Sequence, residues 1–284
     1  MTSRRDFLLQ SGVLSSAFIS NPSGFFKKNS KVGLQLYTLR NDLSKDAKGT
    51  IQKVAAIGYK EVESFGYHDG KYFGMTAKEF ATFLKGLGLT TPSGHYGLGN
   101  LTKGWETAIE DAKTVGQKYM VLAYLQENER KTLDDYKKVA DTMNNAAKMC
   151  KAAGIQFCYH NHDFEFVDLG SGIGYDILTK NTDPGLVKFE LDLYWATKAN
   201  QKPVDLFKKY PGRFPLWHAK DMDNTDKHYF TEVGNGTIDF KSIFANAKTA
   251  GMKHFFVEQD DCQPGPPLTS IATSFNYIEH NLVK

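Results

Sequence analysis

Seven glycines divide the chain into repeating units of similar length. Each glycine lies just before a short apolar run that is typical of a buried strand, and consecutive glycines are 27 to 39 residues apart. This spacing is the size of one β-α unit, and glycine after a helix supplies the left-handed residue that turns the chain. The seven are Gly58, Gly88, Gly116, Gly154, Gly185, Gly212 and Gly251.

The runs between these glycines predict eight strands that alternate with helices. The expected strands cover residues 32–37, 59–64, 89–95, 119–123, 155–162, 186–193, 214–220 and 254–258. The expected helices cover 44–57, 76–87, 102–115, 132–153, 175–179, 204–210, 239–250 and 268–280, and the one from Thr76 begins with a capping box to Glu79. This pattern favours a single (β/α)8 TIM barrel, an α/β fold, from residue 31 to 284. An open doubly wound sheet requires a Gly-rich loop after the first strand, and Leu36–Arg40 has no glycine.

The first 30 residues are expected to lie outside this barrel. Ser3–Leu8 contains two consecutive arginines and precedes a mildly apolar stretch, Val13–Ile19. That arrangement resembles a twin-arginine export signal and predicts a periplasmic or otherwise exported protein. The alternative is an unstructured end of a cytoplasmic protein.

Charge and cysteine content exclude some classes of protein. The net charge is only +3, from 35 basic and 32 acidic side chains, so we expect neither nucleic acid nor a membrane as partner. The three cysteines are an odd number at irregular spacing, which is no disulfide framework. A small molecule is the expected partner, and the oligomeric state is left open.

The densest group of reactive side chains is Tyr159–Phe166. It follows an apolar run, and alternate residues of a strand share a face, so His160 and His162 are expected to point the same way. In a barrel, active sites form at the carboxyl ends of the strands. A polar strand end with satisfied hydrogen bonds is the alternative for two such histidines taken alone.

Other strands end in ionisable residues too, and buried ionisable groups are costly unless they are paired or bind something. The inner positions near the strand ends are Glu61, Glu63, His95, His160, His162, Glu190, Asp192, His218, Lys220, Glu258 and Gln259, with Glu165 just beyond the fifth strand. An ion-pair network that plugs the barrel is one explanation, and Glu61 is equally suited to pairing with a lysine at the surface. The other explanation is a site for one divalent metal ion, held by Asp192, His218, Glu258 and one of the two histidines at the end of the fifth strand, with His160 preferred over His162 by its position. Imidazole and carboxylate ligands suit Mn, Zn, Co or Fe better than Mg.

The chain resembles the xylose isomerase-like barrels, a family that includes sugar isomerases and epimerases. The resemblance covers the chain from about Val32 to its end and is carried by Tyr159–Phe166, Phe189–Tyr194, Trp217–Asp221, Val233–Phe240 and Val257–Glu258.

Relatives in this family usually bind one divalent ion through Glu, Asp, His and Glu on strands five to eight. The last three positions match Asp192, His218 and Glu258, whereas His160 stands where the family has its first Glu. In the family's epimerases, the two glutamates work as a pair of proton-transferring groups. The exchange at His160 therefore leaves epimerisation open against one-sided proton abstraction, as in dehydration.

The resemblance implies proton removal next to a carbonyl group of a sugar. His162 or Glu165 is the expected base, with Glu258 as the second residue at the reacting carbon, and Lys220 is expected to donate to the developing oxygen charge. An ion pair with Asp221 or Glu190 is the alternative for Lys220. Binding of sugar hydroxyls and rings is assigned to Glu63, His95, His162 and Trp195.

Two further features bear on the substrate. Few arginines lie in the expected site loops, Arg40 and Arg130 among them, which favours an unphosphorylated sugar. Val233–Ile238 resembles a phosphate-binding loop but lacks the lysine that such loops carry. We therefore interpret it as part of the pocket rim, followed by Asp239 as a helix N-cap.

The sequence thus leaves several functions open. The first is a metal-dependent sugar isomerase or epimerase, and the second is a lyase or dehydratase of a keto-sugar or 3-keto-glycoside. A sugar-binding protein without activity is a third. A phosphodiesterase is disfavoured, because the charge balance gives no basic groove.

Overall fold

Eight parallel strands close into a barrel in the computed structural model, which describes residues 31–263 and 265–283. The order around the barrel is β1-β12-β9-β8-β7-β6-β5-β2. The strands are β1 (Gly33–Gln35), β2 (Glu61–Ser64), β5 (Thr90–Tyr96), β6 (Tyr119–Leu122), β7 (Gln156–His160), β8 (Val187–Asp192), β9 (Leu216–Ala219) and β12 (His254–Val257). The prediction of a single TIM barrel is confirmed, and the expected signal at residues 1–30 lies outside the described residues.

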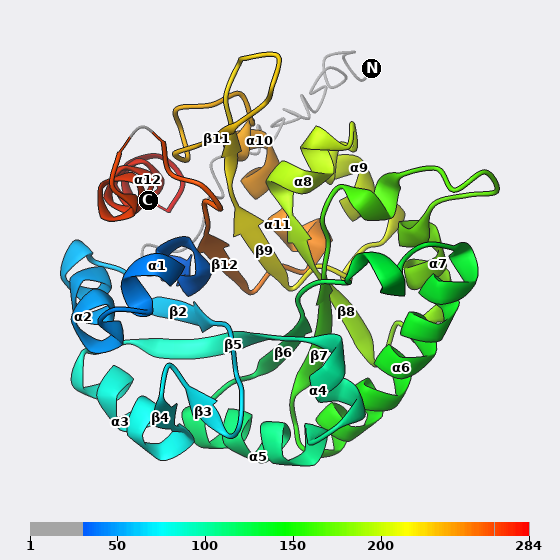
Figure 1. Ribbon diagram of the computed structural model, residues 1–284. Helices are drawn as coiled ribbons and strands as arrows, with labels where there is room; N and C mark the ends of the chain where they lie inside the picture. The colour runs from blue at the N-terminus through cyan, green and yellow to red at the C-terminus, as the bar shows by residue number, and fades with distance from the viewer. Residues whose placement is uncertain (1–30, 264, 284) are drawn as a thin grey trace, which may run out of the picture.

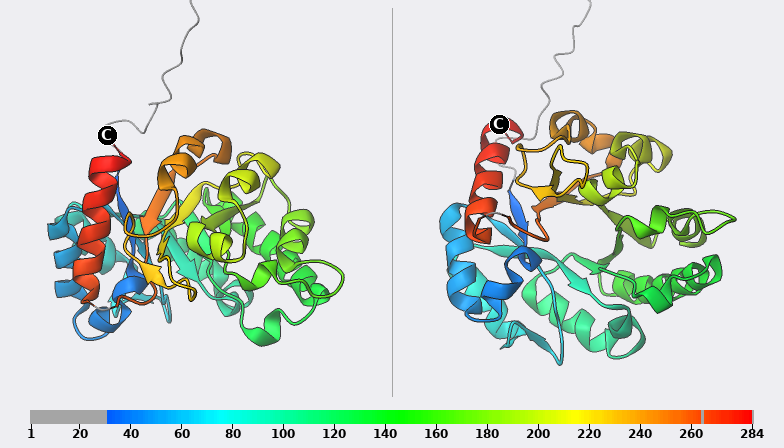
Figure 2. Two further views of the ribbon diagram at one scale, coloured as in Figure 1. Left: turned by 90° about the horizontal axis from the view of Figure 1, so that it is seen from above. Right: turned by 45° about the horizontal axis from the view of Figure 1, so that its top comes forward.

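Helices surround the strands, as Figures 1 and 2 show. They are α1 (Arg40–Leu43), α2 (Ala47–Ile57), α3 (Ala77–Gly86), α4 (Leu98–Thr102), α5 (Trp105–Val115), α6 (Leu133–Ala152), α7 (Gly174–Asn181), α8 (Leu193–Lys198), α9 (Pro203–Lys209), α10 (Phe240–Ala245), α11 (Ala247–Ala250) and α12 (Pro267–Asn281). Three short 3-10 helices are η1 (Leu36–Leu39), η2 (Glu127–Glu129) and η3 (Phe164–Phe166). Among the described residues, none of the helices combines the length and the apolar character needed to cross a membrane.

Local signals in the sequence place the helix ends. Thr76 and Glu79 form the expected capping box, and Asp239 accepts the backbone N–H of Ser242 as the N-cap of α10. Six of the seven punctuating glycines have positive φ, with Gly116 (φ 91°) as the C-cap of α5; Gly185 is the exception. The glycine pattern therefore marks helix ends for the physical reason that predicted it.

Two small hairpins were not expected from the sequence. One is β3 (Lys71–Tyr72) with β4 (Met75–Thr76), which lies between β2 and α3, and the other is β10 (Asp221–Met222) with β11 (Phe230–Thr231) after β9. Each interrupts a β-α connection beyond the carboxyl end of its strand (Figure 1).

The inner face of the barrel changes from apolar to polar along the strands. Val121, Cys158, Leu216 and Phe256 form a separate buried cluster. Two residues further along β7, β9 and β12, the chain has His160, His218 and Glu258. Since side chains two apart share a face of a strand, the apolar layer forms a floor beneath the polar side chains.

Candidate active site

The carboxyl ends of the strands open into a cavity of about 830 Å³. Histidines from β5 and β7, the aromatic residues Tyr37, Phe65 and Trp195, and the carboxylate of Glu258 all line it. This is the end of a TIM barrel at which active sites form.

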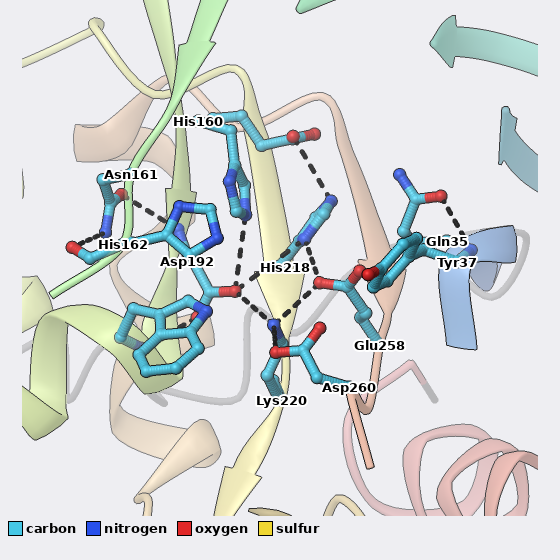
Figure 3. Close-up of polar contacts among 12 residues, drawn as sticks. Gln35, Tyr37, His160, Asn161, His162, Asp192, His218, Lys220, Glu258 and Asp260 are labelled. Atoms are coloured by element: carbon cyan, nitrogen blue, oxygen red, sulfur yellow. Dashed lines mark hydrogen bonds and ion pairs between the residues drawn. The ribbon is translucent and has the colours of Figure 1, made fainter. Parts of the chain in front are cut away.

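Four side chains from four consecutive strands meet at the base of this cavity (Figure 3). We call His160, Asp192, His218 and Glu258 the ion layer; each offers one ligand atom, and these atoms all lie within 4.8 Å of one another. The Nε2 atom of His160 is 3.4 Å from Oδ2 of Asp192, and Nδ1 of His218 is 2.8 Å from Oε2 of Glu258. The structure thus brings together the four residues expected to hold a metal.

The ion layer is built as a binding site rather than as a closed hydrogen-bond network. Nε2 of His160 and Oδ2 of Asp192 are buried and make no hydrogen bond, although both lie within ion-pair distance of neighbouring groups. Buried polar atoms are normally hydrogen-bonded, so two such atoms aimed at one point require an explanation. Two imidazoles and two carboxylates are a ligand set suited to a divalent transition metal or zinc.

Lys220 lies beside the ion layer and is enclosed by acids. Its Nζ is 3.0 Å from Oδ2 of Asp192 and 2.8 Å from both Oε2 of Glu258 and Oδ2 of Asp260. Burial lowers the pKa of Lys220, but the three carboxylates outweigh burial and raise it well above its ordinary value. Lys220 therefore carries a permanent charge and pairs with neither Asp221 nor Glu190, the partners considered from the sequence.

The same contacts hold the acids ionised. Asp192 is fully buried, yet Lys220 lowers its pKa to about 2, and Lys220 with His218 lowers the pKa of Glu258 well below its ordinary range. Asp192, Glu258 and Asp260 against the ammonium of Lys220 leave a charge of −2 when all three acids are ionised and His218 is neutral. That charge is the complement of one divalent cation. Without a metal, burial lowers the pKa of His218, but Glu190 and Glu258 outweigh burial and raise it well above its ordinary value, so a bound cation would displace that proton.

A second buried group, which we call the support layer, lies against the other side of His218. Nε2 of His218 is 2.7 Å from Oε2 of Glu63 and 3.3 Å from Oε2 of Glu190, while Nε2 of His95 is 2.6 Å from Oε2 of Glu190. Gln35 also donates to Oε2 of Glu63 at 2.7 Å. Glu63, His95 and Glu190, the members of this layer, therefore hold the His218 ring from below.

His218 belongs to both layers but can ligate only one ion. A neutral imidazole has one nitrogen with a free lone pair, and the other carries hydrogen. If Nε2–H donates to Glu63, Nδ1 faces Asp192 and Glu258 and is free to ligate, as in other carboxylate–histidine–metal arrangements. The support layer together with His218 also has the geometry of a metal site, but it presents only His95 to the cavity, whereas the ion layer presents two residues, His160 and Glu258.

His162 lines the cavity above His160. Its ring stacks on Phe164 at a centroid distance of 5.2 Å and lies 5.4 Å from the ring of Trp195. Burial, followed by the nearby His160 and Lys220, lowers the pKa of His162 well below its ordinary value. Its buried Nδ1 has no hydrogen-bond partner. His162 is therefore a neutral imidazole with a free nitrogen beside the ion layer.

Glu165, expected as a mobile base, does not line the cavity. Its side chain is fully buried, where Oε1 accepts from the hydroxyl of Tyr159 at 2.6 Å and Oε2 accepts from the backbone N–H of His162 at 2.8 Å. Tyr159 alternates with His160 along β7, so it faces away from the barrel interior. Burial raises the pKa of Glu165 to about 7. The residue fastens the loop that carries His162, and the expected direct role is corrected accordingly.

Two other glutamates also differ from expectation. Glu63 is fully buried in the support layer and does not line the cavity, so it reaches a sugar only through His95, which does. Glu61 is the first residue of β2, at the amino end of the barrel, where it pairs with His254 at 2.7 Å and Lys31 at 3.7 Å. The pairing of Glu61 with a lysine, which the sequence offered as the alternative to a site role, is therefore the one that the structure favours.

The glycine-rich loop after β9 surrounds a side-chain carboxylate, that of Asp221. The carboxylate of Asp221 accepts the backbone N–H groups of Met222, Gly234, Gly236 and Ile238 at 2.8 to 3.1 Å. A Cβ on Gly236 would collide with this carboxylate. The loop does not line the cavity, so its expected role as a pocket rim is corrected to anchoring the β10–β11 hairpin.

Sequence reasoning missed one residue of the site, Asp260, and did not place Glu190 at its depth in the barrel. Asp260 lies in the loop after β12, where no strand period indicates its direction, yet it contacts Lys220 and lines the cavity. Glu190 was noted at its strand end, but its place in the support layer depends on the tilt of the barrel strands. Trp195, by contrast, lines the cavity where it was expected.

Comparison with known proteins identifies the family to which the chain belongs. A model of the xylose isomerase-like TIM barrel matches residues 51–279. The chain belongs to this family.

Several relatives carry names. The chain is 30% identical over 169 residues to the inosose dehydratase of Geobacillus kaustophilus (53% of this chain, 54% of the relative), and 25% identical over 160 residues to that of Serratia proteamaculans (51% and 52%). The chain thus spans about half the length of the curated relatives it matches.

Solved structures match over most of the chain. A sugar phosphate isomerase/epimerase of Parabacteroides distasonis has a TM-score of 0.78 and 28% identity, covering 90% of this chain and 96% of the other. The IOLI protein, solved with a zinc atom, has a TM-score of 0.68 at 15% identity, covering 87% and 95%, which is a likeness of fold alone.

Proposed function

We propose that this chain is a metal-dependent enzyme that removes a proton next to the carbonyl group of an unphosphorylated sugar. The observation that carries the proposal is the convergence of His160, Asp192, His218 and Glu258 at the base of a cavity lined by aromatic rings. The dehydratases and isomerase/epimerase named among its relatives support a sugar as substrate.

The ion layer would hold one divalent cation, with Mn, Zn, Co or Fe favoured over Mg by its two imidazoles. When bound, such an ion supplies Lewis acidity that stabilises negative charge on the oxygen of the carbonyl undergoing enolisation. Asp192 and Glu258 supply the negative charge that retains the cation, and Glu63 fixes the orientation of His218.

His162 is the base in this proposal. It is neutral and it lines the cavity, so its imidazole can accept a proton from the substrate carbon. The rings of Phe164 and Trp195 hold the imidazole in place and limit access of water. Glu258 stays ionised beside Lys220 and is the second group at the reacting carbon.

Lys220 and Asp260 act on the oxygen atoms. Lys220 is buried and does not line the cavity, so its ammonium acts on developing negative charge through its electric field, and it holds Asp260, which does line the cavity, at 2.8 Å. Asp260 itself is 24% exposed and lines the cavity, so it can also contact a hydroxyl of the substrate. His95 and Trp195 contribute a hydroxyl ligand and a ring surface.

Elimination of water is the reaction that the position of Glu165 favours. Epimerisation by two carboxylates requires one on each side of the reacting carbon. Glu258 can supply one of them, but Glu165 is buried outside the cavity, and His160 stands at the position where the family has its other glutamate. One base and one oxygen-directed acid suffice for dehydration of a keto-sugar or 3-keto-glycoside. The second candidate is a sugar isomerase or epimerase, favoured by the 28% identity to the Parabacteroides distasonis protein over 90% of this chain.

The charges around the cavity favour a substrate without phosphate. Arg40 is the one lysine or arginine among the described cavity-lining residues, whereas Glu129, Glu258 and Asp260 are acidic. Arg40 itself packs on the ring of Tyr37 at 4.6 Å, and Arg130 packs on Phe164. Phosphate sites usually present arginine forks or several backbone amides.

Product analysis in deuterated water tests the reaction. Protein loaded with Mn or Zn is incubated with keto-sugars and a 3-keto-glycoside, and NMR follows deuterium uptake and loss of water. Deuterium uptake with elimination supports the dehydratase, and uptake with the carbon skeleton and hydroxyls intact supports the isomerase. Sugar binding without exchange, unaffected by metal removal, would identify a binding protein and refute the enzyme.

Export of the folded protein is part of the proposal. The paired arginines of Ser3–Leu8 and the apolar stretch after them support a twin-arginine route. Cell fractionation of the full chain checks it, with Arg4→Lys and Arg5→Lys together as the control. A wild-type protein retained in the cytoplasm would refute export.

A further inference from the structure

A second hollow continues from the cavity over the β3–β4 hairpin. It has a volume of about 350 Å³ and shares Phe65 and Gly66 with the main cavity. We call it the hairpin pocket; its remaining lining residues are His68, Asp69, Lys71, Phe73 and Gly74. The two hollows are therefore neighbours at Phe65 and Gly66, and a ligand that lies over these two residues contacts both.

The hairpin that forms the pocket is held rigidly from behind. Tyr72 is buried, stacks on Phe80 at 5.2 Å, and its hydroxyl lies 3.1 Å from that of Tyr96. The hydroxyl of Tyr67 donates to Asp111 at 2.6 Å. These contacts fix the two tyrosines toward the body of the barrel, which leaves the alternate side chains of the hairpin to face the pocket.

The hairpin also holds an unfavourable backbone conformation. Phe73 has φ of 50°, a left-handed value that is a real outlier for a bulky side chain. Its ring packs against Phe65 at 5.3 Å and Phe80 at 5.7 Å. Strain of this kind persists where surrounding contacts enforce it, and it is concentrated at ligand-binding sites. Here it sets the ring of Phe73 behind that of Phe65.

The lining of the hairpin pocket has the chemistry of a carbohydrate subsite. Two aromatic rings offer a surface for the C–H face of a sugar, and His68, Asp69 and Lys71 offer hydrogen-bonding groups at the rim. Both His68 and Asp69 are more than 80% exposed, with 3.1 Å between Nδ1 and Oδ2. A sugar hydroxyl can therefore bridge them without displacing a buried contact.

The hollow on the opposite rim is less suited to this role. It has a volume of about 290 Å³ and shares only Phe230 with the main cavity. Its Asp223 already accepts hydrogen bonds from Thr225 and the backbone N–H of Tyr229.

The size of the combined space also exceeds one ring. Pockets of about 300–1,000 Å³ enclose drug-sized ligands, and the main cavity alone has about 830 Å³. We propose that the hairpin pocket binds the second ring of a two-ring carbohydrate, so that the substrate is a glycoside rather than a free monosaccharide. This inference rests on the proposed function, because it takes the reacting ring to lie over the ion layer.

Matched glycine substitutions test the subsite. Gly74 lines the hairpin pocket but not the main cavity, and a Cβ there meets nothing within 4 Å, so Gly74→Asn adds a side chain to the open space. Gly88→Asn is the control, because Gly88 has a similar φ (68° against 80°) and equal space, at the amino end of β5. Asparagine tolerates the left-handed conformation of both sites. Lys71→Ala, at an exposed position, is a second variant should Gly74→Asn fail to fold.

The probes are 3-keto-glucose and the 3-keto forms of cellobiose and maltose, with zinc-loaded protein. We expect kcat/KM to be at least about tenfold higher for one of the disaccharides. Gly74→Asn or Lys71→Ala should reduce this advantage, and Gly88→Asn should keep it. Equal kcat/KM for one and two rings, or an advantage that survives both pocket variants, would overturn the subsite.

A failure of the proposed function gives a different result. If none of the three keto-sugars turns over, binding of unoxidised glucose, cellobiose and maltose is measured by saturation-transfer NMR. Preferential binding of a disaccharide that Gly74→Asn or Lys71→Ala removes supports the subsite on a protein of other activity. Equal or absent binding of all three overturns the subsite as well.

Discussion

Replacing Asp192 by asparagine removes one charge from the ion layer and leaves its shape. Asp192 uses Oδ1 to accept the backbone N–H of Trp195 at 2.8 Å as the N-cap of α8, and asparagine retains that oxygen. Oδ2, which faces His160 and Lys220, becomes an uncharged amide. The substitution therefore tests the charge at the ligand position with little change in packing.

Two magnitudes follow from the surroundings of Asp192. Unit charges about 4 Å apart interact by about 4 kcal/mol at an effective dielectric constant of about 20, so we expect metal affinity to fall by two to three orders of magnitude, at about 1.4 kcal/mol for each factor of ten. In the metal-free protein the pKa of Asp192 is lowered from 3.8 to about 2. At about 1.4 kcal/mol per pKa unit, the lost charge costs on the order of 2 kcal/mol of folding stability at neutral pH.

Titration calorimetry with Zn or Mn, together with elemental analysis of purified protein, measures the affinity. Thermal melts of the metal-free proteins measure the stability. Asp134→Asn is the control, because it removes the charge of an exposed aspartate that pairs with Lys137 on α6, away from the ion layer. Metal affinity of Asp192→Asn within about threefold of the wild type would show that Asp192 is no ligand and would refute the ion layer as the metal site.

Three further predictions concern the support layer, the loop after β7 and the loop after β9. Burial lowers the pKa of His95, but Glu63 and Glu190 outweigh burial and raise it from 6.5 to about 9. The protonated His95 therefore contributes fully to the stability of the metal-free protein below pH 6.5, and this contribution is lost as the pH rises through 9. Thermal melts whose midpoint stays constant over this pH range would contradict the prediction. Glu165→Gln should keep metal content and turnover within a few fold, whereas a hundredfold loss of kcat in steady-state assays would restore the mobile base. Asp221→Ala leaves four backbone N–H groups without their acceptor. Gly234 is exposed and Gly236 and Ile238 are half-buried, so water replaces part of what is lost, and we expect a cost of about 1–3 kcal/mol, the range for one buried group left unpaired. An unchanged denaturation midpoint would argue against the anchoring role.

The direction of the inner side chains was predictable from the sequence. Alternate residues of a strand share a face, so the strand ends predicted a set of inward side chains that includes His160, Asp192, His218 and Glu258, and the resemblance to the family supported the choice of the last three as ligands. The barrel itself followed from the glycine spacing. These are local properties, and the tertiary structure had only to bring the strand ends together.

Depth along the barrel axis was not predictable in the same way. Barrel strands are tilted and staggered, and β8 pairs with β9 so that Asp192 lies opposite His218 while Glu190 lies opposite Leu216. A residue such as Glu63 can therefore face inward and still lie beneath the ligands. Glu165 and Asp260 lie beyond the ends of their strands, where a turn replaces the strand period and only the folded loop decides the direction.

The charge of the ion layer has a consequence for iron. Asp192, Glu258 and Asp260 with the ammonium of Lys220 carry a net charge of −2 at the base of the cavity when His218 is neutral, which matches two positive charges. Oxidation of ferrous to ferric iron would add a third charge with no carboxylate to neutralise it, and an unpaired charge of that kind is costly in a protein interior. The site should therefore stabilise ferrous over ferric iron, or favour an ion such as zinc that has no higher oxidation state.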